Sequence, residues 1–134
     1  MSGLDFWIGD WDAAWDGGTG RSTVNRELAD RVVVERFEAV GEEPFSGLSI
    51  SVADPAGRWR QTWADSVGNY WAFVGGPQDD ESFVFATPGP VDAEQLFKRM
   101  VFFNIAADSF DWRWEVSPDA ETWTQRWAIE YRRR

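Results

Sequence analysis

The regular spacing of turns constrains the fold of this chain more than any other feature, because turn signals recur about every eight to twelve residues. Most are clusters rich in Gly, Pro, Asp and Ser, which suit the backbone angles of tight turns. No segment between them keeps a helical period of 3.6 residues over three turns. The signals lie at 16–18, 29–30, 41–44, 54–57, 65–68, 75–77, 88–90, 107–108 and 117–119.

The segments between these breaks alternate apolar and polar residues, as strands with one buried face do. We predict strands at 10–16, 19–28, 31–40, 45–53, 58–65, 69–75, 82–87, 96–104, 109–116 and 122–132. A meander of short strands buries one face and loses its free edges by closing into a barrel. The expected fold class is therefore all-β, a single antiparallel up-and-down β-barrel of about ten strands forming one domain over 1–134. A two-sheet sandwich is the alternative, but the long crossing connections that it usually needs are not evident.

Tryptophan accounts for ten of the 134 residues, and most of these residues stand two or four positions apart. Rings at that spacing on strands point to the same side of a sheet. A core filled solidly would more naturally use Leu and Ile, and the chain has only four of each. We therefore expect the indoles to line a cavity, since a barrel of this size can enclose a small ligand.

The formal net charge is −10, which argues against a nucleic-acid or anionic-membrane partner. The chain contains neither Cys nor His, so thiolate nucleophiles, Ser-His-Asp triads, common zinc sites and His-ligated haem are excluded. We expect no metal and no cofactor. The first eleven residues lack the basic and apolar regions of a signal peptide, and the apolar stretches are shorter than a membrane span, which favours a cytoplasmic location.

The segment Phe6-Trp7-Ile8-Gly9-Asp10-Trp11 opens the first strand with a Gly-x-Trp motif, and the chain closes on a basic strand at 127–134. With the segment 57–68, GRWRQTWADSVG, this pattern resembles the calycin superfamily of lipocalin, fatty-acid-binding and nitrobindin-like proteins, and is most similar to uncharacterised bacterial lipocalin-like proteins. The resemblance implies that Trp11 plugs the closed end of the barrel, with a late Arg packed near it. Nitrobindin-like proteins bind haem through a His that this chain lacks, so haem binding does not carry over. The helical lid of fatty-acid-binding proteins is also missing, because 16–18 turns directly into the next strand.

Alternation along four strands assigns a set of inward side chains. Gln61 and Gln125 stand out because they interrupt apolar faces, and a buried amide needs a hydrogen-bond partner that a ligand could supply. The residues expected to face inward are Trp11, Ala13 and Trp15; Trp59, Gln61 and Trp63; Phe110, Trp112, Trp114 and Val116; and Trp123, Gln125, Trp127, Ile129 and Tyr131.

One charged pair is also expected inside the barrel. A two-residue turn at 29–30 pairs Arg26 with Val33. If Val33 faces inward, so do Glu35 and Arg26, which then lie diagonally adjacent and within reach of each other. A paired buried carboxylate is tolerable where a lone one is costly. The other register of this strand leaves Glu35 in solvent, and the sequence leaves both registers open.

Alternate turns of an up-and-down barrel lie at the same end, so the longest loop, near 88–95, shares the end away from Trp11 with four other turns. We take that end as the mouth. The residues expected nearest to it are Trp15, Arg21, Phe37, Phe45, Trp63, Asp65, Tyr70 and Trp71. The predicted ligand-binding residues are Trp15, Arg26, Glu35, Phe37, Gln61, Trp63, Tyr70, Trp112, Trp114, Gln125 and Trp127.

These features favour a protein that binds a small hydrophobic or aromatic molecule inside a Trp-lined barrel. An alternative is a cofactor-free isomerase, cyclase or decarboxylase, in which burial raises the pKa of Glu35 and Tyr70 or Arg26 stabilises charge. A third interpretation is a non-catalytic scaffold that forms a homodimer through a barrel face. The absence of His and Cys favours binding over catalysis.

Overall fold

The computed structural model describes residues 3–41 and 43–134, and the part of the predicted turn at 41–44 that falls on Glu42 lies outside the described residues. A short 3-10 helix, η1 (Asp5–Trp7), precedes ten strands. No helix in the described part of the chain has the length and apolar character of a membrane span. The strands are β1 (Gly9–Trp15), β2 (Gly18–Glu27), β3 (Val32–Val40), β4 (Phe45–Ala53), β5 (Trp59–Asp65), β6 (Tyr70–Pro77), β7 (Phe83–Ala86), β8 (Phe97–Phe103), β9 (Ser109–Ser117) and β10 (Thr124–Arg133).

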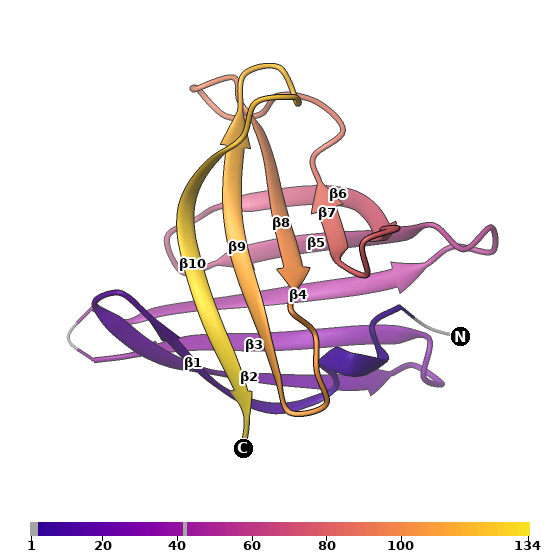
Figure 1. Ribbon diagram of the computed structural model, residues 1–134, viewed down its shortest axis with the longest axis vertical. Coiled ribbons are helices and arrows are strands. Elements are labelled where there is room, and N and C mark those ends of the chain that lie inside the picture. Colours follow the sequence, from indigo (N-terminus) through magenta and orange to yellow (C-terminus); the bar gives the residue numbers. More distant parts are fainter. Residues whose placement is uncertain (1–2, 42) are drawn as a thin grey trace.

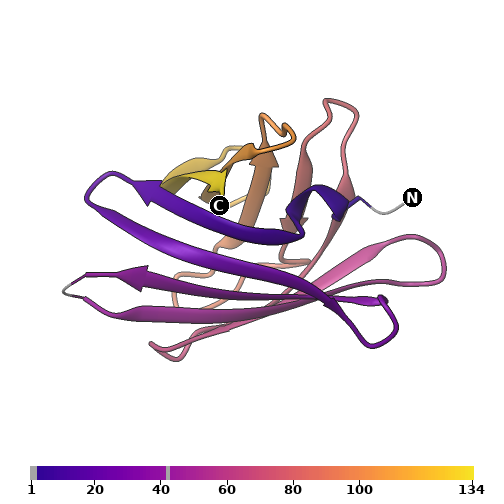
Figure 2. The ribbon, with the colours of Figure 1, turned by 90° about the horizontal axis from the view of Figure 1, so that it is seen from below.

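The strands form one closed antiparallel barrel, in which each pairs with its neighbours in the chain and β1 pairs with β10. Strands β8 to β10 run steeply across β2 to β5 (Figure 1), and β1 lies between β2 and the C-terminal end of β10 (Figure 2). Every predicted strand is present, with boundaries that differ by two residues at most. The predicted up-and-down barrel is confirmed, and this architecture is consistent with a calycin-like fold.

The closed end of the barrel is built around Trp11, which is fully buried. Its indole N–H donates a 2.8 Å hydrogen bond to the carbonyl of Trp7 in η1. The guanidinium of Arg133 lies 4.3 Å from the centre of the Trp11 ring and donates to the carbonyls of Ile8 at 2.8 Å and Phe6 at 3.3 Å. We call this assembly of Trp7, Trp11 and Arg133 the plug. It has the arrangement that the resemblance to calycins implies.

Phenylalanine rings fill the space next to the plug. Phe102 lies 5.2 Å from Trp7, and Phe110 lies 4.8 Å from Trp11, both edge to face. Phe110 in turn stacks on Tyr131 at 4.6 Å. Such aromatic pairs contribute about 0.5–1.5 kcal/mol each beyond the area that they bury. The closed end is therefore solid, and any open space must lie toward the other end.

A β-bulge in β10 changes which of its residues face inward. Trp127 pairs with Trp114, whereas Gln125 pairs with Glu115, so the register shifts between Gln125 and Trp127. The extra residue reverses the alternation. Gln125 is exposed, and its predicted inward orientation is wrong.

The same bulge places Trp123 on the outside of the barrel. The guanidinium of Arg99 lies 4.0 Å from the centre of the Trp123 ring, and Arg99 also bonds the carboxylate of Glu115 at 2.7 Å. Trp123 therefore covers an external ion pair, and its predicted inward orientation is also wrong. This leaves one indole outside the barrel that is useful as an experimental control.

Candidate ligand-binding cavity

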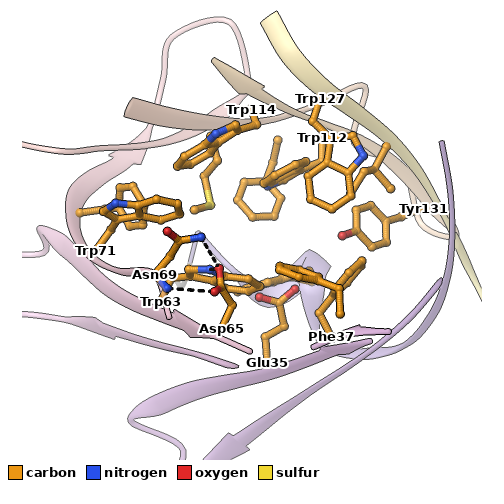
Figure 3. Close-up of a pocket in the computed structure, with 16 residues that line it drawn as sticks. Glu35, Phe37, Trp63, Asp65, Asn69, Trp71, Trp112, Trp114, Trp127 and Tyr131 are labelled. Carbon is orange, nitrogen blue, oxygen red and sulfur yellow. Dashed lines mark hydrogen bonds between the residues drawn. The ribbon is translucent and has the colours of Figure 1, made fainter. Parts of the chain in front are cut away.

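A cavity of about 210 Å³ lies between the plug and the open end of the barrel. Figure 3 shows it as a space enclosed by aromatic rings, with polar groups at only a few points. Because a cavity of about 150 Å³ in another protein holds benzene, this volume suits a ligand of one or two rings. The lining consists of Trp7, Glu35, Phe37, Phe45, Trp63, Asp65, Asn69, Trp71, Phe73, Met100, Phe102, Trp112, Trp114, Trp127, Ile129 and Tyr131.

Six indoles line this space, with Trp7 of the plug at its inner end and the other five around its sides. Trp112 and Trp114 stand parallel, with ring centres 6.3 Å apart and an angle of 8°. Trp71 lies 5.2 Å from Trp114, and Trp127 lies edge-on to Trp112 at 5.6 Å. Trp63 lies on the opposite side of the cavity from Trp112, Trp114 and Trp127 (Figure 3). The space between the two sides suits a flat aromatic molecule.

Glu35 supplies the carboxyl group of the cavity. Its strand adopts the register that faces Val33, Glu35 and Phe37 inward, so the alternative register is excluded. Glu35 is only 7% exposed, and it accepts hydrogen bonds from Ser49 at 2.9 Å and Ser22 at 3.2 Å. Burial raises the pKa of Glu35 to about 7, although the two serine hydroxyls act in the opposite direction. The group is thus poised to change its charge near neutral pH.

Arg26 does not pair with Glu35, contrary to the prediction. The register places Arg26 opposite Val33 as expected, but the guanidinium forms an ion pair with Asp5 in η1. Asp5 precedes the first strand, so strand alternation could not place it at the closed end. No basic residue lines the cavity in the described part of the chain.

Tyr131 provides the hydroxyl group that faces Glu35 across the inner end of the cavity (Figure 3). Burial raises the pKa of Tyr131 well above its ordinary value, and the charge of Glu35 raises it further. The phenol therefore stays protonated and neutral over the range in which proteins are studied. It offers a hydrogen-bond donor and acceptor to a molecule in the cavity.

Asp65 and Asn69 form the polar rim on one side of the mouth. The carboxylate of Asp65 accepts hydrogen bonds from the indole of Trp63 at 2.9 Å and from the amide of Asn69 at 3.0 Å. Partial burial acts to raise the pKa of Asp65, but these bonds and two from backbone amides outweigh it and lower the pKa below its usual value. The ionised carboxylate holds the Trp63 ring in place, with its face toward the cavity.

The connection between β7 and β8 is bonded to Trp71 of the cavity wall. Asp92 accepts a 3.0 Å hydrogen bond from the indole of Trp71 and an ion pair at 3.4 Å from the buried Lys98. Glu94 lies 3.3 Å from Lys98 and forms two hydrogen bonds with Arg126, at 3.1 and 3.0 Å. Charged contacts therefore tie this connection to β6, β8 and β10.

The structure brings six of the predicted binding residues to the cavity and places the others elsewhere. Trp15 packs behind the lining, with its ring 5.3 Å from Trp127. Gln61 is buried outside the cavity and donates a 2.9 Å hydrogen bond to Ser51. Tyr70 is 69% exposed, since its neighbour Trp71 faces inward. Arg26 and Gln125 also lie outside the cavity, as described above. The predicted binding residues that line the cavity are Glu35, Phe37, Trp63, Trp112, Trp114 and Trp127.

Two groups of site residues lie outside the predicted binding set, although Trp71 is among those expected near the mouth. Trp71 lies directly opposite Trp63 in the β5–β6 register, which the turn at 65–68 could have indicated. Ser22 and Ser49 are the partners of Glu35, and both occupy inward positions on neighbouring strands. The sequence signal for these partners was the presence of small polar residues at inward positions beside a candidate buried acid.

A comparison with protein-family models gave no match, and a comparison with curated proteins gave none either. Within residues 3–41 and 43–134, no cluster of three or more carboxylates is arranged to hold a metal ion. The function therefore has to be inferred from the cavity and its chemical groups.

Proposed function

We propose that the protein binds a small, mainly apolar aromatic molecule inside the barrel. The observation that carries this proposal is the cavity of about 210 Å³ lined by six indoles. Ligand sites are typically concave and mostly apolar, with a few polar groups that set orientation. Here Glu35 and Tyr131 are the polar groups at the inner end of the cavity, and Asp65 and Asn69 are those at its mouth.

The wall of the cavity is preorganised for ligand binding. The indole N–H groups of Trp63 and Trp71 are satisfied by Asp65 and Asp92, so neither ring has to turn to find a partner. Both rings therefore present their faces to the cavity in the ligand-free protein. A site that is already ordered loses little conformational entropy on binding, which favours affinity.

We also infer that the chain is a divergent bacterial lipocalin-like protein of the calycin superfamily. Support comes from the Gly9-Asp10-Trp11 motif at the closed end and from Arg133 against the ring of Trp11.

Isothermal titration calorimetry with neutral one-ring and two-ring compounds, such as indole and naphthalene, tests the binding proposal. Met100 lines the cavity, so Met100→Trp should fill it and abolish binding. Trp123→Phe, which alters an indole outside the barrel, should leave binding unchanged. Ile129→Phe is the second filling variant if Met100→Trp does not fold. The proposal is wrong if no compound binds, or if the filled variants bind as tightly as the wild type.

Catalysis of proton transfer without a cofactor is a second candidate, favoured by the buried Glu35 with a pKa of about 7. An acid or base works best when its pKa lies near the operating pH. Glu35 could move a proton from the α to the γ carbon of a β,γ-unsaturated ketone, with Tyr131 donating a hydrogen bond to the carbonyl oxygen. The rise in ultraviolet absorbance of the conjugated product measures the reaction. Equal rates for the wild type and Glu35→Gln would rule this candidate out.

A further inference from the structure

The charged side chains that line the cavity, and that a ligand can therefore reach, are all acidic. Among the described residues that line the cavity, the charged groups are Glu35 and Asp65. The groups that face Glu35 from neighbouring strands are the uncharged hydroxyls of Ser22 on β2 and Ser49 on β4. From β10 it meets only the neutral phenol of Tyr131. Within residues 3–41 and 43–134, Glu35 therefore has no counter-ion.

Basic side chains near both ends of this space are already paired. Arg26 is held by Asp5 at the closed end. Lys98 is held by Asp92 and Glu94 at the mouth. Among the residues that the structure describes, a ligand carboxylate would thus meet two acidic groups and no free cation. The cavity lacks what a fatty acid or another anionic ligand needs.

The carboxyl group of Glu35 also keeps unused hydrogen-bonding capacity. Ser49 binds Oε1 and Ser22 binds Oε2, one donor to each oxygen. An ionised carboxylate oxygen accepts about two hydrogen bonds, so each oxygen has room for one more donor. The carboxyl group is directed into the cavity (Figure 3), where a ligand would be that donor.

We propose that the ligand is an arylalkylamine, whose ring lies between the indole walls and whose ammonium group pairs with Glu35. This inference rests on the proposed binding function and assigns the chemical class of the ligand. The surrounding rings add to the preference, because the faces of Trp attract cations more strongly than those of Tyr or Phe. Trp63, Trp112 and Trp127 lie around the part of the cavity nearest Glu35 (Figure 3).

Amine binding should release a proton. In the free protein Glu35 has a pKa of about 7 and is partly protonated at neutral pH, whereas an ammonium ligand requires the carboxylate. Affinity should therefore rise about tenfold per pH unit as pH increases toward 7, and level off above it. Tyr131 stays protonated and Asp65 stays ionised over this range, so neither obscures the effect.

Three compounds of similar size test the assignment: 2-phenylethylamine, 2-phenylethanol and 3-phenylpropanoate. By calorimetry at pH 8, we expect the amine to bind about tenfold more tightly than the alcohol, and the anion not to bind. Glu35→Gln should remove the advantage of the amine over the alcohol. Glu38→Gln, an exposed change on the same strand, should behave as the wild type. Titrations of the amine at pH 7 in phosphate and in Tris should give binding enthalpies that differ in proportion to the protons released.

The possible failures are distinguishable. If the neutral compounds bind but the amine has no advantage, or if its advantage survives in Glu35→Gln, the ligand class is wrong and the binding function stands. Tight binding of the anion leads to the same conclusion. If neither this series nor the neutral panel binds, the binding function itself is wrong.

Discussion

The hydroxyl of Ser49 lies 2.9 Å from Oε1 of Glu35 and donates a hydrogen bond to it from the next strand. Ser22 contacts the other oxygen at 3.2 Å from the strand on the opposite side. Hydroxyl groups stabilise the carboxylate but bring no charge, so burial still dominates and the pKa of Glu35 rises to about 7. The pKa of Glu35 therefore affects both the pH dependence of the protein's stability and the binding of its ligand.

Replacement of Glu35 by Gln should make the ligand-free protein more stable at pH 8 but not at pH 4. The folded protein favours the protonated form of Glu35, whose pKa is 4.5 in the unfolded chain and about 7 in the folded protein. The free energy of unfolding therefore falls as pH rises from 4.5 to about 7, and this contribution is constant above pH 7. A shift of this size corresponds to at most about 3 kcal/mol. Urea unfolding at both pH values, with Glu38→Gln as the control, measures the difference. An equal effect at pH 4 and pH 8 would show that Glu35 is not responsible.

Removal of the Arg133 side chain should weaken the plug. Arg133→Ala loses three hydrogen bonds, to the carbonyls of Phe6, Ile8 and Ala107, and the contact with the Trp11 ring. We expect a loss of about 2–4 kcal/mol in the free energy of unfolding. Arg132→Ala, which changes an exposed neighbour, should cost less than about 0.5 kcal/mol. Similar urea midpoints for the two variants would contradict the role given to Arg133.

A methyl group at Gly75 should be far more damaging than one at Gly76. A β-carbon at Gly75 would overlap the backbone carbonyl of Val84 on β7, and that backbone cannot move without breaking the β6–β7 pairing. Nothing lies within 4 Å of a β-carbon at Gly76. We expect Gly75→Ala to destabilise by about 1–3 kcal/mol or more, and Gly76→Ala to be nearly neutral, in thermal unfolding. Equal melting temperatures would disprove this prediction.

The connection between β7 and β8 should loosen when Glu94 is neutralised. Glu94→Gln removes the ion pairs with Lys98 and Arg126 but leaves Asp92 in place. Amide hydrogen exchange over residues 88–96 should become several-fold faster, since local opening requires less free energy. About 0.5 M salt should have a similar effect on the wild type. Glu121→Gln serves as the control, and unchanged exchange in Glu94→Gln would argue against this tether.

Most of the fold could be predicted because two signals agree throughout the chain. Turn residues mark the ends of the strands, and alternation marks their faces, so β4 was predicted over its exact range, 45–53. The register of β2 with β3 followed from the short turn between them, which places Arg26 opposite Val33. Local patterns of this kind do not depend on distant parts of the chain.

The errors arise where a distant or irregular contact decides the outcome. Gln125 and Trp123 were assigned inward because alternation assumes a regular strand, and the bulge in β10 has no clear signal in the sequence. Arg26 was paired with the wrong acid, because Asp5 lies in η1 rather than on a strand. Tyr70 and Trp71 are adjacent aromatics, and only the cross-strand pairing with Trp63 determines which of them faces inward.

The pairing of β1 with β10 has a consequence for how the chain folds. Trp11 on β1 pairs with Arg133 on β10. The first strand of the barrel therefore cannot complete its pairing until the last strand has been synthesised. Until β10 arrives, the nascent chain can form only a curved sheet with its indole face open to water. Pairing between residues this far apart along a chain is slow to form. Closure is therefore a late event that follows translation of β10, and the indoles that later line the cavity stay exposed to water until then.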